Sequence, residues 1–341
     1  MKPLKLQPVL LLTLAILFCY GCQEPADNVV NFEHDLSSGP TPWSHENFNN
    51  QSDQFTFAII SDLNGGEREG IFSVAVEQIN LFRPEFVLSV GDLIDGGTED
   101  QTQLTKEWES FDARAARLNA PFFHLGGNHD LTNVAMRDFW KKRYGPRYYH
   151  FRYKDVLFLM MDSEDYEEDR MQEIYEARAK AIEVLDGDEP EKYPETAYYS
   201  MQERRTGEIS PTQNAYFEQV LRDHSDVKWT FILMHKPVWM REEGNNFGPM
   251  EALLRKRSYT VINGHFHAYS HQKKNDRDYI ILGTTGGSQN PSNEGAYDHI
   301  TLVTMTANEP DIINVKLARM LDKTGKIPLN GDTLEFEPTR Q

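Results

Sequence analysis

Five short apolar stretches of this chain each end in a loop that contains aspartate, asparagine or histidine. A run such as Phe86–Val90, which leads into Gly91–Asp95, is typical of a buried strand. In an open α/β sheet, ligands bind beyond the carboxyl ends of the strands. We therefore expect these polar side chains to meet at one edge of a sheet. They are Asp62 and Asn64, Asp92 and Asp95, Asn128 and His129, His235, and His265 and His267.

Helical patterns separate these runs and predict an α/β fold. Residues 71–82 place their apolar side chains on one face of a helix, which Pro84 would end. The order from residue 55 to 90 is strand, helix, strand, which is typical of a βαβ unit. Ser210 followed by Pro211 predicts the start of another helix.

The residue types at the five strand ends are those that bind metal ions. Asp92 has two carboxylate oxygens and can touch two ions at once. His265 and His267 would face the same side of an extended backbone. Both cysteines of the chain lie at positions 19 and 22, so the remainder has no thiolate ligand. Oxygen and imidazole ligands suit Mn, Fe or Zn.

In order, the five blocks resemble the signature of the calcineurin-like metallophosphoesterase superfamily. That signature reads Asp-x-His, Gly-Asp-x-x-Asp, Gly-Asn-His-Asp/Glu, a lone His and Gly-His-x-His. The matching residues are Asp62–Asn64, Gly91–Asp95, Gly127–Asp130, His235 and Gly264–His267, within about residues 55–305. The resemblance implies a four-layer α/β/β/α sandwich with two mixed sheets. It also implies two divalent metal ions, Mn, Fe or Zn, at one edge.

The resemblance further implies a role for each residue. Asp62, Asp92 and His267 would hold one ion, and the second would take Asp92, Asn128, His235 and His265. Two ions would activate a hydroxide that attacks the phosphorus of a phosphate ester. His129 would be the catalytic histidine, kept protonated by Asp95, and would stabilise charge or protonate the leaving group.

Asn64 departs from the family pattern, which usually has histidine at this position. An amide oxygen is a weaker ligand for a transition metal than imidazole. We keep Asn64 among the predicted ligands and expect the ion next to it to be held more loosely, or only with substrate present. Harder ions such as Mn or Mg would then be favoured, and loss of activity is the alternative.

The first 22 residues resemble a bacterial lipoprotein signal. Lys2 and Lys5 precede an apolar run over residues 9–18, which is too short to span a bilayer comfortably. Cys22 follows and would carry a lipid anchor, which predicts an exported protein held at the membrane on the periplasmic or cell-surface side. Cys19 stands where such signals usually have leucine. An ordinary cleaved signal or an uncleaved anchor is the alternative.

The remaining chain divides by composition. We predict a flexible tether over residues 23–53, the metallophosphoesterase domain over 54–320 and a tail over 321–341. An acidic insertion at about 162–209 interrupts the domain; its residues 164–195 carry 13 acids and 4 bases. Since most connections are far shorter, this insertion is predicted to act as a lid or selectivity element.

The predicted function is metal-dependent hydrolysis of a phosphorylated substrate. One alternative is a phosphodiesterase acting on cyclic nucleotides or phospholipid headgroups. Another is a non-catalytic lipoprotein that uses the sandwich as a binding module. The net charge of −18 argues against nucleic acid as a specific partner. Neither the substrate nor the oligomeric state follows from the sequence, because loops decide selectivity.

Overall fold

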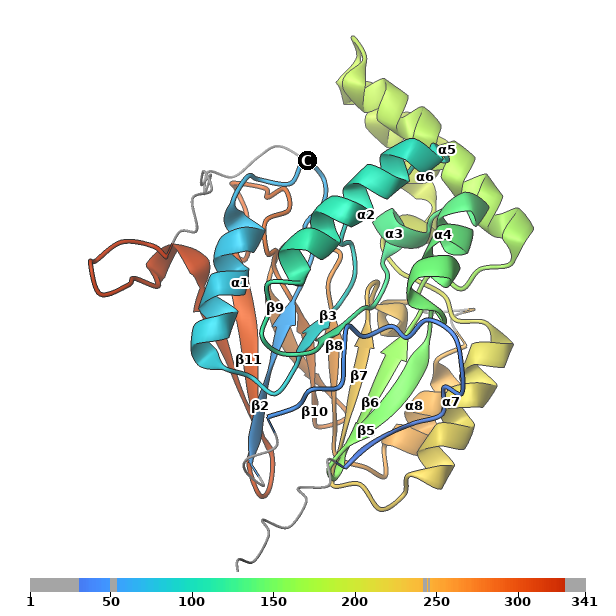
Figure 1. Ribbon diagram of the computed structural model, residues 1–341. Helices are drawn as coiled ribbons and strands as arrows, with labels where there is room; N and C mark the ends of the chain where they lie inside the picture. Colours follow the sequence, from blue (N-terminus) through green and yellow to red (C-terminus); the bar gives the residue numbers. More distant parts are fainter. Residues whose placement is uncertain (1–30, 50–53, 242–243, 245, 329–341) are drawn as a thin grey trace, which may run out of the picture.

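Two β-sheets packed face to face form the centre of the molecule, and helices cover both outer faces (Figure 1). The computed structural model describes residues 31–49, 54–241, 244 and 246–328. The predicted signal, with Cys22, and most of the predicted tail lie outside the described residues.

The larger sheet has seven strands and the smaller has five. The order in the larger sheet is β1 (Phe32–His34), β5 (Tyr149–Tyr153), β6 (Val156–Met161), β7 (Trp229–Met234), β8 (Tyr259–Asn263), β10 (Arg277–Ile281) and β9 (Ser270–Lys274). The order in the smaller sheet is β12 (Pro310–Lys316), β11 (His299–Met305), β2 (Phe55–Ile60), β3 (Val87–Ser89) and β4 (Phe122–Phe123).

Both sheets are mixed: the larger has a parallel centre with antiparallel edges, and the smaller has parallel strands on one side and antiparallel strands on the other. Strands β6, β7, β8 and β10 are parallel, and so are β2, β3 and β4. The antiparallel pairs include β5 with β6, β9 with β10, and β11 with β2. The prediction of two mixed sheets is therefore confirmed.

Helices form the outer layers. The smaller sheet is covered by α1 (Ile71–Phe82), α2 (Gln101–Ala115) and α4 (Val134–Tyr144), and the larger by α7 (Pro211–Asp223) and α8 (Gly248–Leu254). Shorter elements are α3 (Asn128–Leu131), α6 (Ala197–Ser200), and the 3-10 helices η1 (Pro190–Glu195), η2 (Gln202–Arg204), η3 (Val238–Met240) and η4 (Leu317–Arg319). Ser210 caps α7 by accepting the backbone N–H of Gln213, as the sequence predicted.

The central strands are apolar on both faces, because alternate side chains pack into two different cores. In β2, Phe57 and Ile59 pack between the two sheets, whereas Ala58 and Ile60 pack against α1 and its neighbours. Neighbouring residues of β6 divide in the same way between the inter-sheet core and the α7–α8 layer. A sheet covered on both faces needs such continuous apolar strands, and the predicted four-layer α/β/β/α sandwich is confirmed.

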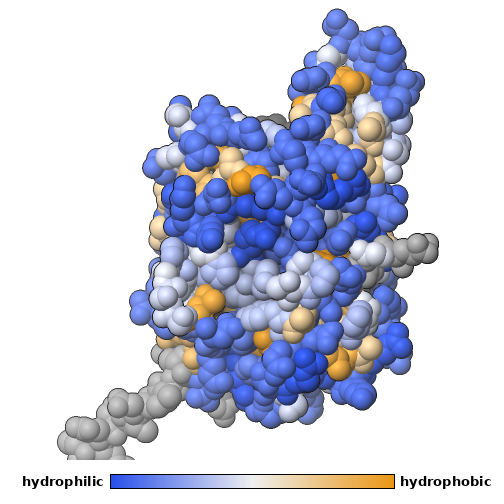
Figure 2. Space-filling model, turned by 90° about the vertical axis from the view of Figure 1, so that its right-hand side faces the viewer, coloured by the Kyte–Doolittle hydropathy of each residue, from blue (hydrophilic) through white to orange (hydrophobic). Residues whose placement is uncertain are grey.

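The insertion between β6 and α7 forms a separate arm. Helix α5 (Glu168–Asp186) projects beyond the two sheets and has its own small core with Tyr166 and Tyr198 (Figure 1). Figure 2 shows a largely hydrophilic face, with apolar atoms gathered on part of the arm. The exposed apolar residues of the insertion include Ile182 and Leu185.

Part of the predicted tether packs on the domain. Strand β1 pairs antiparallel with β5, and Trp43 is buried against Phe123, with ring centroids 5.6 Å apart. The prediction of a flexible tether is therefore wrong for residues 31–49. The segment is polar and has no periodicity, but a few aromatic side chains are enough to hold it. Strands β9 and β12 were also missed, because both are short on buried apolar residues.

Among the described residues, no helix is both long enough and apolar enough to cross a membrane.

Replacing Trp43 with alanine tests whether this segment belongs to the folded domain. We expect the free energy of unfolding to fall by about 3–5 kcal/mol, the usual cost of truncating a buried tryptophan. Asn47→Ala, an exposed change in the same segment, should stay within about 0.5 kcal/mol. Urea unfolding followed by far-UV circular dichroism measures both. Equal, small effects would show that the segment contributes nothing.

Candidate metal centre

The loops after β2, β3, β7 and β8 meet at one edge of the sandwich. Hydrogen bonds between the two sheets align them: Nδ1 of His235 lies 2.8 Å from the Val90 carbonyl, and the His265 N–H lies 3.1 Å from Oδ1 of Asp62. The block at residues 127–130 joins them as the start of α3, whose residue His129 donates its N–H to Asp92 at 2.8 Å. All five predicted strand ends therefore contribute to one site.

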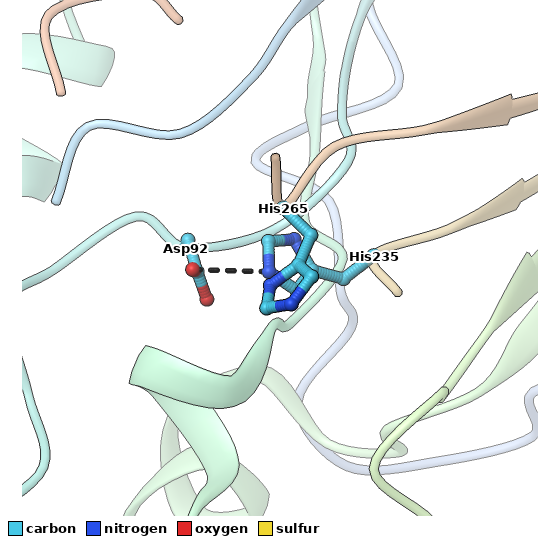
Figure 3. A group of neighbouring side chains, drawn as sticks. All are labelled: Asp92, His235 and His265. Atoms are coloured by element: carbon cyan, nitrogen blue, oxygen red, sulfur yellow. Dashed lines mark ion pairs between the residues drawn. The ribbon is translucent and has the colours of Figure 1, made fainter. Parts of the chain in front are cut away.

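Asp92, His235 and His265 form the first group of possible metal ligands (Figure 3). Their ligand atoms all lie within 4.8 Å of one another. Nε2 of His235 is 3.0 Å from Oδ2 of Asp92, and the two imidazole rings have centroids 5.2 Å apart. The three side chains come from three separate loops and point toward a common centre.

A second group shares Asp92 and adds Asp62 and His267. Nε2 of His267 lies 3.2 Å from Oδ1 of Asp62. Asp62 and Asp92 are almost fully buried. The side chain of Asp92 thus belongs to both groups, which is the arrangement that the resemblance implied.

Backbone carbonyls determine which nitrogen of each histidine faces the centre. His235 and His267 use Nδ1 against the carbonyls of Val90 and Ser288, so Nε2 points inward. His265 instead places Nε2 2.9 Å from the Arg204 carbonyl, which leaves Nδ1 for the centre. Since a carbonyl oxygen can only accept, each of these contacts fixes a tautomer suited to metal binding.

At the site, two of the buried amide oxygens that lack a hydrogen-bond partner among the described residues belong to predicted ligands. They are Oδ1 of Asn128 and Oδ1 of Asn64, both predicted ligands. Asn64 donates its amide N–H to Oδ2 of Asp92 at 2.8 Å. A buried oxygen without a donor costs free energy, and a cation is one partner that would satisfy it. The donor set of carboxylate, imidazole and amide groups therefore fits divalent metal ions.

The electrostatics of the centre also favour cations. Burial alone would favour the neutral form of Asp92, yet His235 and His129 outweigh it and hold the pKa of Asp92 well below its ordinary value. Burial opposes the charge on His235 as well, but Asp92 raises the pKa of His235 to about 9. A buried carboxylate of this kind needs a positive partner, which a proton on His235 or a metal ion can supply.

Four of these residues have a strained backbone. The φ angles are +39° for Asp62, +57° for Asp92, +79° for His265 and +52° for His267. Non-glycine residues rarely adopt positive φ, and such strain gathers at functional sites. The expectation that His265 and His267 share one face of an extended backbone is therefore wrong; the bend assigns them to different ligand groups.

Gly127 and Asp130 hold the loops in this strained form. A Cβ at Gly127 would collide with the Asp92 carboxylate and the His235 ring. The buried carboxylate of Asp130 accepts the backbone N–H groups of Gly127, Asp92, Leu93 and Ile94. Asp130 stands in the Gly127–Asp130 block, but sequence reasoning gave it no role, because three of its four partners are backbone groups of another loop.

His129 is oriented by the backbone of Asp95. Nδ1 of His129 lies 2.6 Å from the Asp95 carbonyl oxygen, whereas the Asp95 carboxylate accepts the N–H groups of Gly65 and Gly66. The prediction that Asp95 keeps His129 protonated is wrong. Burial and the neighbouring Arg178 lower the pKa of His129 to about 3.

Arg178 and Arg204 were missed because both come from the insertion. Arg178 places Nη2 2.9 Å from Nε2 of His129, and Arg204 supplies the carbonyl that orients His265. The one sequence signal for Arg178 is that it is a basic residue within a strongly acidic segment. A glycine-rich turn at residues 283–287 also lies at the site, where the N–H of Gly287 donates to the Asp62 carbonyl at 3.0 Å.

Comparison with known proteins finds solved structures with a similar fold. The solved structure of a dimetal phosphatase from Danio rerio is 14% identical, covers 77% of this chain and 96% of its own, and gives a TM-score of 0.55. The structure of PhoD is 11% identical, covers 77% of this chain and 68% of its own, and gives a TM-score of 0.51. GAP50 of Plasmodium, described as an anchor in the inner membrane complex, is 16% identical. It covers 84% of this chain and 90% of its own, with a TM-score of 0.50.

At these identities the structural similarities establish the fold alone. No curated protein matches the sequence. The family model for calcineurin-like phosphoesterases matches residues 55–269, which is more than half of the chain. This protein therefore belongs to the calcineurin-like phosphoesterase family.

Proposed function

We propose that this protein hydrolyses a phosphate ester with two divalent metal ions, Mn, Fe or Zn. The observation that carries the proposal is the position of Asp92, whose carboxylate belongs to both ligand groups. Asp62 and His267 would complete one set, with Asn64 beside them. Asn128, His235 and His265 would complete the other. Bound there, the ions would polarise the phosphoryl oxygens and lower the pKa of water.

The chain itself would orient the reacting groups. Asn64 and the backbone N–H of His129 hold the two oxygens of Asp92 in place. The Asp95 carbonyl fixes the proton of His129 on Nδ1 and leaves Nε2 facing away from Asp95. Because His129 is neutral, it would accept a hydrogen bond or a proton before it could act as an acid. The α5 arm reaches this edge through the contact of Arg178 with His129.

Two other functions remain to be tested against this one. A phosphodiesterase would use the same ligand sets. A non-catalytic binding module is conceivable on this fold, since GAP50 is described as an anchor. The buried, strained ligand groups and the oriented His129 favour catalysis, because a binding module has no need to maintain that strain.

We also propose that the protein is exported and anchored to the membrane through a lipid at Cys22. The support is the sequence alone: two lysines, an apolar run and a cysteine directly after it.

Removing a shared or single ligand tests the proposed centre. Asp92→Asn and His265→Ala should each lower kcat/KM on p-nitrophenyl phosphate more than roughly a hundredfold, because loss of a ligand exceeds the 10–100-fold effect of its supporting contacts. Bound metal, measured by mass spectrometry, should fall in parallel. His271→Ala, an exposed histidine on β9, is the control. Full activity and unchanged metal in either ligand variant would refute the assignment.

Asn64→His tests the one departure from the family pattern. Imidazole is the stronger ligand, so we expect Mn²⁺ at the weaker site to bind roughly tenfold tighter, about 1.4 kcal/mol. Asn64→Ala, which removes the amide that holds Asp92, should weaken the same site. Calorimetric titration of Mn²⁺ into the wild type and the two variants gives the dissociation constants of both sites. Two tight sites in the wild type, unchanged in Asn64→His, would show that Asn64 is an adequate ligand.

Cys22→Ser tests the proposed anchor. The variant should be released into the soluble fraction or keep its uncleaved signal, whereas the wild type should partition into detergent. Cell fractionation and intact-mass measurement of the N-terminal peptide decide between these states. A variant that stays membrane-bound with a cleaved N-terminus would contradict lipidation.

A further inference from the structure

The arm formed by the insertion brings the guanidinium group of Arg178 to His129. Arg178 lies on α5, whose buried residues Met171, Ile174 and Ala181 belong to the small core of the arm. Its guanidinium reaches Nε2 of His129, with Nη2 at 2.9 Å. Nε2 is the ring nitrogen that the Asp95 carbonyl does not use.

Arg178 forms no ion pair with an acid in the part of the chain that the structure describes. Across residues 31–49, 54–241, 244 and 246–328, the structure records no ion pair for it, whereas Arg170 on the same helix pairs with Glu173 and Glu203. This contrast is notable in a segment that carries 13 acids and 4 bases. A guanidinium has five N–H donors in a planar fork, and the recorded hydrogen bond to His129 uses one nitrogen of it.

The loop after Asp95 leaves room for this guanidinium. Gly97 has φ +62°, and a Cβ built there would lie 2.8 Å from Nη1 of Arg178. A side chain at this position would meet the guanidinium unless Arg178 moved. The Gly97 turn and α5 thus lie on two sides of this charge, close to the predicted ligands.

Resting on the phosphoesterase function proposed above, we propose that Arg178 binds the phosphate of the substrate and makes the site selective for phosphate monoesters. A monoester has three non-bridging oxygens and a diester has two. Two of these oxygens would face the ligand groups that share Asp92. Only a monoester then keeps a third, charged oxygen for Arg178, and arginine binds phosphate oxygens strongly through its fork.

Calorimetry with two small anions tests this selectivity without turnover. Inorganic phosphate represents the monoester and dimethyl phosphate the diester, each titrated into Mn²⁺-loaded wild type, Arg178→Met and Arg178→Lys. Lys180→Met removes a charge from an exposed position of the same helix and is the matched control. Bound metal is measured in every protein, and kcat/KM is compared on p-nitrophenyl and bis-p-nitrophenyl phosphate.

We expect Arg178→Met to weaken phosphate binding roughly 10- to 100-fold, the range for a hydrogen bond to a charged group. Dimethyl phosphate binding and metal content should stay nearly unchanged, Arg178→Lys should restore part of the loss, and Lys180→Met should behave as wild type. The monoester kcat/KM should fall with phosphate affinity. Equal losses for both anions, loss of metal, or no loss at all would overturn the role given to Arg178.

The binding data also separate this inference from the proposed hydrolysis. A wild type that binds phosphate but cleaves neither ester would refute the hydrolysis alone, and the anion comparison would still decide the role of Arg178. A wild type that binds no phosphate would overturn the inference.

Discussion

The site depends on the placement of one buried carboxylate. Asp92 is held at a φ of +57°, and its two oxygens accept hydrogen bonds from the His129 backbone and the Asn64 amide. Its pairing with His235 brings a loop of the larger sheet against a loop of the smaller one. Because a buried carboxylate is costly without compensating charge, the surrounding residues must supply positive groups, and the arrangement suits cations.

The sandwich makes that placement possible. Parallel strands β2 and β3 in one sheet, and β7 and β8 in the other, end at the same edge, so their loops can touch. The inter-sheet core keeps the two edges in register, and the glycine at position 127 lets the backbones approach closely. Asp130 then collects four backbone N–H groups that would otherwise be buried without partners. The strain at the site is thus balanced by hydrogen bonds and core packing elsewhere.

Much of this could be predicted because the informative residues are local in sequence. Apolar runs and the residues directly after them predicted the sheets and the convergence of the predicted ligands. The parts that were missed depend on contacts between distant segments. The packing of Trp43, the use of the Asp95 carbonyl for His129 and the approach of Arg178 all require the folded chain. The carbonyl that orients His129 is a backbone group, which every residue has, so the sequence could not indicate it. The protonation of His129 was therefore predicted wrongly.

A crystal structure of the Mn²⁺-loaded protein with bound phosphate, with anomalous scattering to locate the ions, tests the central claim most directly. The account predicts two manganese peaks roughly 3.5–4 Å apart, with the Asp92 carboxylate bound to both and His235 and His267 on different ions. A single ion, or two ions that do not share Asp92, would contradict it.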